Sequence, residues 1–185
     1  MKHDEGLTLR PPRTADAAFM EGLFRSTREH FYYSMPAPRE HVDLLIAQQY
    51  RLQQAHYARQ WPAARTLIIE RSGMPIGKIT LDEGETALHI VDFIIEPAAR
   101  GQGYGTAMLQ ALQTTAKARR ITLSVDRQNL PAKRLYLALG FRVDAVSETH
   151  EAMSWVTPAF PDKIAGGIFH KQNDIERHRR SDDHG

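Results

Sequence analysis

The chain has 185 residues, 42% of them hydrophobic and 25% charged, which is the composition of a single soluble globular domain. The net charge of +2 is nearly balanced and shows no concentrated basic stripe, so a nucleic-acid partner is not expected. Without cysteine, signal peptide or a long apolar run, disulfides, thiol chemistry and membrane insertion are excluded, and a cytoplasmic location is expected.

The first 60 residues predict a short strand followed by two helices. Residues 7–10 alternate in hydrophobicity, and two prolines end them. Thr14 or Asp16 can cap the first helix. A proline-containing segment separates it from a second helix at residues 39–60, whose expected apolar stripe is Val42, Leu45, Ile46 and Leu52.

The middle of the chain predicts strands. Residues 66–70 and 76–81 form a hairpin around a turn at residues 71–75. A further acidic turn leads into an apolar, β-branched strand at residues 90–95, which Pro97 stops because proline lacks an N–H for the ladder.

A strand, a glycine turn and a helix start follow one another at the centre of the chain. Gly101, Gly103 and Gly105 precede a helix with amphipathic spacing, expected to run to about Ala118. The first N–H groups of a helix lack partners, and glycine lets a ligand approach the backbone closely. This order therefore predicts an anion site suited to a diphosphate.

The last part predicts a strand at residues 121–125, a helix closed by Gly140 as its C-cap, and a final pair of strands at residues 141–143 and 151–156. The pattern dissolves after Pro158. We therefore expect one domain at residues 1–156 and a partly mobile C-terminal extension at residues 157–185.

Two motifs resemble those of the GNAT superfamily of N-acetyltransferases. Residues 100–105 read Arg-Gly-Gln-Gly-Tyr-Gly and match the acyl-CoA signature Gln/Arg-x-x-Gly-x-Gly/Ala. Residues 129–141 resemble the segment Asn-x-x-Ala-x-x-Leu-Tyr-x-x-x-Gly-Phe. The resemblance covers residues 7–156. It implies a mixed α/β fold with a mostly antiparallel sheet flanked by helices, in which a splayed parallel strand pair forms the acyl-CoA cleft near Phe93 and Ser124.

The same resemblance implies an enzyme that moves an acetyl group from acetyl-CoA to an amine. Direct transfer, with no covalent acyl-enzyme, is expected because the chain has no cysteine and no motif for an activated serine. The alternative is a non-catalytic acyl-CoA-binding or regulatory module. A dinucleotide-binding turn is a further rival for the glycine loop, because glycine spacing alone is weak evidence. The second motif, which a dinucleotide site does not require, favours CoA. By resemblance, the CoA-binding residues are Phe93, Ile94, Ile95, Arg100, Gly101, Gln102, Gly103, Tyr104, Gly105, Thr106, Asn129 and Lys133.

Tyr136 matches the family's general acid. The ordinary pKa of tyrosine, about 10, lies above that of a thiol, about 8.5, so a phenol can protonate the departing thiolate. Packing on an apolar helix face is the other interpretation of this tyrosine. Asn129 can contact CoA, cap the helix that it precedes, or do both.

The general base stays open between His89 and Asp92. The family often places a glutamate on the central strand, and this chain has none at the corresponding position. His89 has the better ordinary pKa, whereas Asp92 is the only carboxylate in an apolar strand. The two side chains point to opposite faces of a regular strand, unless a bulge intervenes.

The resemblance implies an acceptor pocket shaped by the first two helices and their connection. A wall of hydrogen-bonding side chains and a solvated helix surface are both compatible with the residues there. The histidines show no metal spacing, so no metal is expected. Exposed strand edges make a homodimer plausible. The candidate acceptor residues are Phe31, Tyr32, Tyr33, Gln49, Gln53, His56 and Tyr57.

Overall fold

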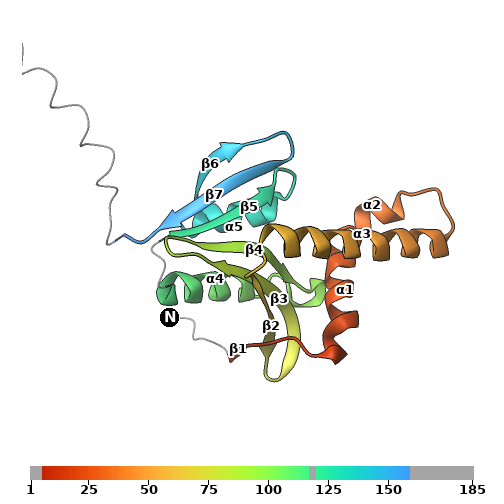
Figure 1. The fold of residues 1–185 in the computed structure, drawn as a ribbon, viewed down its shortest axis with the longest axis horizontal. Coiled ribbons are helices and arrows are strands. Elements are labelled where there is room, and N and C mark those ends of the chain that lie inside the picture. Colours follow the sequence, from red (N-terminus) through yellow and green to blue (C-terminus); the bar gives the residue numbers. More distant parts are fainter. Residues whose placement is uncertain (1–5, 117–119, 159–185) are drawn as a thin grey trace, which may run out of the picture.

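The computed structural model describes residues 6–116 and 120–158. These residues form a seven-stranded sheet with the order β1-β2-β3-β4-β5-β7-β6, flanked by helices (Figure 1). Neighbouring strands are antiparallel except β4 and β5, which are parallel. The predicted fold class, a mostly antiparallel mixed sheet with one central parallel pair, is confirmed.

The strands are β1 (Leu7–Arg10), β2 (Arg65–Arg71), β3 (Met74–Glu83), β4 (Leu88–Ile95), β5 (Arg120–Asp126), β6 (Arg142–Val146) and β7 (His150–Val156). The α-helices are α1 (Ala17–Ser26), α2 (Glu29–Tyr33), α3 (Arg39–Gln60), α4 (Tyr104–Thr115) and α5 (Leu130–Ala138). Two 3₁₀ turns, η1 (Thr14–Asp16) and η2 (Pro97–Ala99), precede α1 and α4.

The β2–β3 hairpin is tighter than the sequence predicts. Arg71 pairs with Met74, so the turn lies where it is expected but contains only Ser72 and Gly73 instead of residues 71–75. Both turn residues have left-handed backbones, with φ of 50° and 77°. Two successive left-handed residues match the twist of a hairpin, which allows the strands to continue up to the turn.

Three expectations about the helices need correction. The short helix α2, which the sequence did not predict, lies between the two predicted helices. Leu52 is 62% exposed, so it does not belong to the buried stripe of α3, where Val42 and Ile46 are buried. The helix after the glycines ends at Thr115 rather than near Ala118, which lies outside the described residues. Helical spacing alone predicted the inward face but not which apolar residues meet a partner.

The two faces of the sheet differ in chemistry. Residues that include Ile79, Ile90 and Leu123 point to one face and pack with Met108 and Leu109 of α4 in the main core. The opposite face carries the polar side chains Lys78, Thr80, Asp92, His89, Thr122 and Ser154. This second face, which lies toward α1 and α3, bears the chemistry described below.

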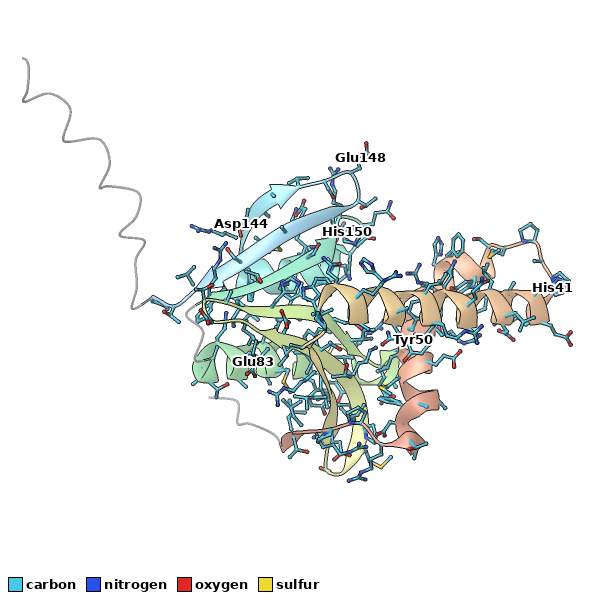
Figure 2. All side chains as sticks on the ribbon, in the orientation of Figure 1. His41, Tyr50, Glu83, Asp144, Glu148 and His150 are labelled. Carbon is cyan, nitrogen blue, oxygen red and sulfur yellow. The ribbon has the colours of Figure 1, made fainter. Side chains whose placement is uncertain are left out.

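Helix α3 crosses the polar face and then projects beyond the sheet. Figure 1 shows its N-terminal half and α2 extending to one side. In Figure 2, Tyr50 lies near the sheet and His41 at the far end of the helix. A small core joins α3 to α1 and α2 through Phe24, Tyr32 and Ile46. This cluster fixes the end of α1 beside β4.

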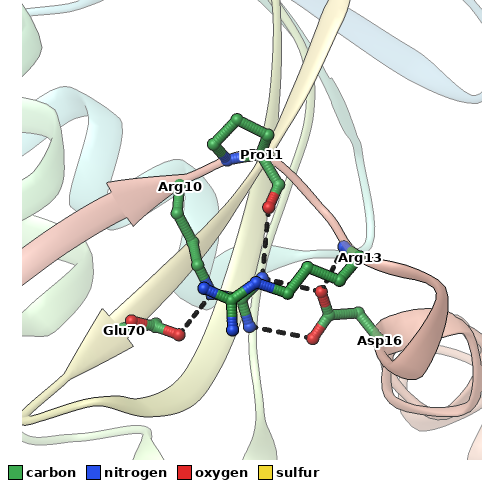
Figure 3. A network of polar contacts seen from close by, with 5 residues as sticks. All are labelled: Arg10, Pro11, Arg13, Asp16 and Glu70. Carbon is green, nitrogen blue, oxygen red and sulfur yellow. Dashed lines mark hydrogen bonds and ion pairs between the residues drawn. The ribbon is translucent and has the colours of Figure 1, made fainter.

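A charged network anchors β1 to the start of α1 (Figure 3). The Arg10 guanidinium donates to both oxygens of Asp16, at 2.7 and 2.9 Å, and also contacts Glu70 of β2. Asp16 further accepts from the Arg13 backbone N–H at 2.6 Å. Asp16 therefore precedes α1, as predicted, but its carboxylate binds Arg10 and Arg13 instead of capping the helix.

The C-terminal motif forms the elements expected of it. Asn129 Oδ1 accepts from the Ala132 N–H at 3.3 Å and so caps α5. Gly140 closes the helix with φ of 88°. The predicted extension lies outside the described residues except for Thr157 and Pro158. In residues 6–116 and 120–158, every helix is too short or too polar to span a bilayer.

Candidate active site

Strands β4 and β5 separate after three residue pairs. They are paired only where Leu88 to Ile90 lie opposite Ile121 to Leu123. Beyond that point β4 stays paired with β3, and β5 stays paired with β7. The two parallel strands therefore diverge, and the predicted splayed pair is present.

A β-bulge in β4 determines which side chains face the opening. Thr80 pairs with Asp92 and Leu81 with Ile90, so Val91 is an extra residue without a direct partner. Asp82 pairs with His89. Because Thr80 and Asp82 point to the same face of β3, His89 and Asp92 also share one face. The opposite orientation expected of a regular strand does not occur.

A cavity of about 210 Å³ opens where β4 and β5 diverge. The strands, α1, α3 and α5 all contribute to its wall. Ser124, which the sequence placed at the cleft, is among the lining residues. The lining side chains that carry chemistry are Gln53, Tyr57, Asp92, Ser124, Asn129 and Tyr136.

Asp92 lies in this cavity and is paired from behind with Lys78. The Lys78 Nζ lies 3.2 Å from Asp92 Oδ2, and the two side chains are 2% and 15% exposed. The Lys78 ammonium also lies 5.8 Å from the centroid of the Tyr50 ring. A buried lysine requires such a counter-charge, because an unpaired charge in the interior is costly. The pair presents a carboxylate to the cavity while nearly cancelling its net charge.

Two tyrosines share the cavity with Asp92. Burial, with a smaller contribution from the negative Asp92, raises the pKa of Tyr136 to about 12. Tyr57 has its pKa raised to about 12 by the same two causes. Tyr136 is only 8% exposed and packs against Phe141, with ring centroids 5.6 Å apart. Both phenols therefore keep their protons at neutral pH.

His89 lies outside the cavity lining. Its Nδ1 is 2.8 Å from Thr122 Oγ1, and its ring stacks on Trp61 with centroids 5.2 Å apart. Burial lowers the pKa of His89. Since Thr122 belongs to the paired part of β5, this histidine sits below the point where the strands separate. Of the two candidate bases, only Asp92 faces the opening.

The glycine loop delivers unpaired amides to the head of α4. Gly103 is the N-cap residue, in the left-handed region with φ of 85°. The first helical bond runs from the Ala107 N–H to the Gly103 carbonyl at 3.0 Å. The N–H groups of residues 104–106 consequently have no partner in the helix. A Cβ on Gly105 would lie 3.4 Å from Leu135 Cδ2, so this glycine also lets α4 pack closely on α5.

Several of the other predicted CoA residues have structural partners. Arg100 Nε donates to the Ile95 carbonyl at 2.9 Å, which ties the loop to the end of β4. Tyr104 is 6% exposed and donates to Gln102 Oε1 at 3.2 Å. Lys133 Nζ lies 2.8 Å from the Glu151 carboxylate.

Strand β4 presents its side chains alternately to core and cavity. The Phe93 and Ile95 side chains pack against the main core, as the sequence suggested. Ile94 pairs with Lys78 and points to the polar face. The three residues from Phe93 to Ile95 can therefore face the cavity together only through their backbone groups.

The structure divides the predicted acceptor residues. Gln53 and Tyr57 line the cavity. Tyr32 is buried and donates to Gln49 Oε1 at 2.9 Å, so these two residues brace α2 against α3. Phe31 and Tyr33 are 52% and 70% exposed on the projecting segment. His56 lies in an aromatic cluster, with its ring 6.1 Å from that of Tyr57 and 6.5 Å from that of Trp61.

Sequence reasoning missed Lys78, the residue behind Asp92. The alternation of residues 76–81 placed a lysine on a strand but did not show which face was covered. Only the pairing register of β3 and β4, including the bulge, brings the ammonium to Asp92. In the part of the chain that the structure describes, no group of three or more His, Cys, Asp or Glu side chains could hold a metal ion.

Comparison with known proteins identifies the family of this cleft. The model of the acetyltransferase (GNAT) family matches residues 26–141, which is more than half of the chain. The chain belongs to the GNAT family. The match contains the projecting helix, the splayed strands, the glycine loop and α5. The resemblance inferred from the two sequence motifs is confirmed.

Among individual relatives of this GNAT protein is the 5-NmdU N-acetyltransferase of Pseudomonas phage PaMx11. The two are 34% identical over 70 residues, which are 38% of this chain and 49% of the relative. The chain thus matches about half the length of that curated protein.

Solved structures share the fold at low sequence identity. The PaiA N-acetyltransferase of Thermoplasma acidophilum, in complex with coenzyme A, superimposes with a TM-score of 0.60 at 18% identity, covering 82% of this chain and 99% of that one. The spermidine N-acetyltransferase of Vibrio cholerae, in complex with CoA and spermine, gives 0.58 at 21% identity, covering 83% and 97%. These likenesses support the GNAT fold.

Proposed function

We propose that this protein is an N-acetyltransferase that transfers the acetyl group of acetyl-CoA directly to an amine. The single observation that carries the proposal is the cavity between the splayed strands, which Asp92 and Tyr136 both line. Membership of the GNAT family and the N-acetyltransferase names of its relatives support it. The catalytic domain comprises residues 1–156.

The glycine loop binds the diphosphate of CoA. The N–H groups of residues 101–106 and the positive end of the α4 dipole stabilise its negative charges. Arg100 holds the loop against β4, and Asn129 and Lys133 contact the cofactor from the start of α5. The β4 backbone near Phe93 to Ile95 binds the pantetheine arm and provides an N–H for the developing oxyanion.

Asp92 and Tyr136 act on opposite partners of the reaction. Asp92 receives the acceptor ammonium and takes up its proton, so that the amine nitrogen can attack the thioester carbon. As the carbon–sulfur bond breaks, the Tyr136 phenol donates its proton to the departing thiolate. The attacking nitrogen gives its second proton to the phenolate that remains, and Asp92 releases its proton to solvent, so a neutral amide and free CoA thiol leave. His89 supports β5 through Thr122 and takes no direct part. Transfer is direct, because the chain has no cysteine to carry an acyl group.

Two measurements on the purified chain test the proposal. A ligand that binds only the folded state stabilises it by about 2.7 kcal/mol at 100 times its Kd, so acetyl-CoA is expected to raise the Tm. Thiol release is then followed with a panel of amines. Absence of CoA binding would refute the proposal. Binding without acetylation of any amine would instead indicate the non-catalytic acyl-CoA-binding module.

A further inference from the structure

The carboxylates that line the cavity are few and largely satisfied. Among the described lining residues, only Asp92 and Asp126 are acidic. Asp92 is neutralised by Lys78, and Asp126 accepts from the Gln128 N–H at 2.8 Å, at the turn into α5. One paired carboxylate can receive one amine. A second positive charge on the acceptor would find only Asp126, at the end of β5.

The α1 side of the cavity carries a cation instead. Phe24 and Thr27 line the cavity at the end of α1, and Arg28 follows them directly. The Arg28 guanidinium lies over the Phe24 ring, 4.8 Å from its centroid. This cation–π contact holds the exposed guanidinium against a ring that lines the cavity.

Arg28 has no anionic partner within residues 6–116 and 120–158, whereas neighbouring Arg25 is paired with Asp43 at 2.6 Å. The positive charge of Arg28 nevertheless acts on residues of the cavity. Burial and Asp92 raise the pKa of Tyr57, and Arg28, the third-largest influence, lowers it. It also opposes the rise that burial causes in the pKa of Tyr32. The electrostatic influence from this side of the mouth is therefore positive.

We infer that the acceptor carries an anionic group, a carboxylate or a phosphate, which Arg28 binds while the amine faces Asp92. The inference rests on the proposed acetyltransferase activity and names its substrate class. Guanidinium groups bind both kinds of anion through parallel N–H donors. A diamine would place its second ammonium toward Arg28, where like charges repel.

Four five-carbon amines test this preference, because they differ only at the end remote from the amine: pentylamine, 1,5-diaminopentane, 5-aminopentanoate and 5-aminopentyl phosphate. One partly exposed ion pair predicts a kcat/KM about two- to fivefold above that of pentylamine for the anionic compounds. The diamine is expected to fall below pentylamine. An advantage for either anion supports the inference and identifies the group. A diamine that equals or exceeds pentylamine, or two anions without advantage, overturns it.

The Arg28→Gln variant assigns the preference to this residue. The ratio of kcat/KM for anionic over neutral amine should fall toward one, and Arg28→Lys should restore much of it. Arg39→Gln is the matched control, since Arg39 also stacks on an aromatic ring, that of Tyr33 at 5.1 Å, but on the projecting segment. Its ratio should equal the wild-type value. An unchanged ratio in Arg28→Gln would show that Arg28 does not bind the anionic group of the acceptor.

Different results would refute the proposed acetyltransferase activity and the proposed anionic acceptor. If no amine is acetylated, the proposed function fails. If pentylamine is acetylated and the diamine is preferred, only the anionic acceptor is refuted. Tm and acetyl-CoA binding of each variant show whether a lost ratio reflects a lost fold.

Discussion

Tyr136 is buried where a proton is needed at the end of the proposed reaction. Its pKa of about 12 follows first from burial and then from the nearby Asp92. The same burial disfavours a thiolate, so the departing group has a raised affinity for a proton. The phenol stays protonated throughout the working range of pH and can donate when the thiolate forms.

Replacing Tyr136 by phenylalanine removes the hydroxyl and keeps the ring that packs on Phe141. We expect kcat to fall by about 10²-fold or more, because a positioned acid contributes on that order, with little change in acetyl-CoA affinity. The raised pKa also means that ionisation of Tyr136 does not reduce the wild-type kcat below about pH 11. Steady-state kinetics over pH measure both effects.

Tyr33→Phe provides the control for this substitution, because the Tyr33 side chain is 70% exposed on the projecting segment. It should leave kcat unchanged. A Tyr136→Phe enzyme that matches the wild-type kcat for every accepted amine would show that the phenol is not the acid.

The two residues proposed to act in the cleft, Tyr136 and Asp92, differ in how far the sequence revealed them. Tyr136 could be named from its place in a motif, since the spacing from Asn129 to Gly140 fixes its position on one short helix. The choice between His89 and Asp92 could not be made, because it depends on an extra residue in the strand. Lys78 was invisible for the same reason: its partner is set by register.

At the scale of elements, strands β3 and β4 approach each other closely at Gly77. Among the described glycines, an added Cβ would meet a neighbouring atom at the shortest distance here. A Cβ on Gly77 would lie 2.4 Å from the Ile94 carbonyl oxygen, which is backbone and cannot rotate away. Only glycine fits there without moving β4. The wall of the cleft therefore depends on a residue that does not line it.

Gly77→Ala is expected to lower the free energy of unfolding by about 1–3 kcal/mol, because the strands must shift to admit the methyl group. Since the displaced atom belongs to β4, acetyl-CoA binding should weaken too. Urea denaturation and a CoA titration measure the two effects.

Gly22→Ala is the matched control in α1, where a Cβ would meet nothing within 4 Å. Alanine is the better helix former, so this substitution should stabilise the protein by about 0.5–1 kcal/mol. Equal effects of the two changes would contradict the close approach of β3 to β4.

Elements bounded by strong local signals could be predicted, and elements set by their neighbours could not. The order of strand, glycine loop and helix follows from Pro97 and three glycines. The bulge at Val91 has no local signal, because its two strands determine it together. Likewise Leu52 follows the apolar spacing of α3 yet is exposed, since none of the described residues covers that side of the helix.

At the scale of the molecule, the charged network around Arg10 connects the first strand, the sheet and the first helix. Hydrogen bonds from Arg10, and then from the Arg13 backbone, hold the pKa of Asp16 well below its usual range. A carboxyl whose folded pKa is depressed contributes stability above its unfolded pKa. That contribution is lost as the pH falls toward the folded pKa.

Asp16→Asn should therefore destabilise the protein near pH 7, and the difference from the wild type should shrink below about pH 4. Urea denaturation at several pH values between 7 and 3 measures it. Asp144→Asn, in a more exposed pair with Arg120 at 3.3 Å, is the control and should show a smaller effect. A difference for Asp16→Asn that stayed constant down to pH 3 would contradict the role of the network.

The whole-molecule topology came from the resemblance, because a mixed sheet with one parallel pair cannot be chosen from alternation alone. The predicted homodimer, the cytoplasmic location and the absence of metal and nucleic-acid partners stay predictions, as does the extension at residues 157–185.

The divergence of β4 from β5 places a strand edge inside the protein rather than at its rim. Past Ile90, every second peptide group of β4 turns away from β3 and has no ladder bond to β5. Such an interior edge suits a slender guest that carries its own amides, as pantetheine does. These peptide groups should accordingly exchange their hydrogens with solvent faster than their β5-paired counterparts, and slow down when acetyl-CoA is added.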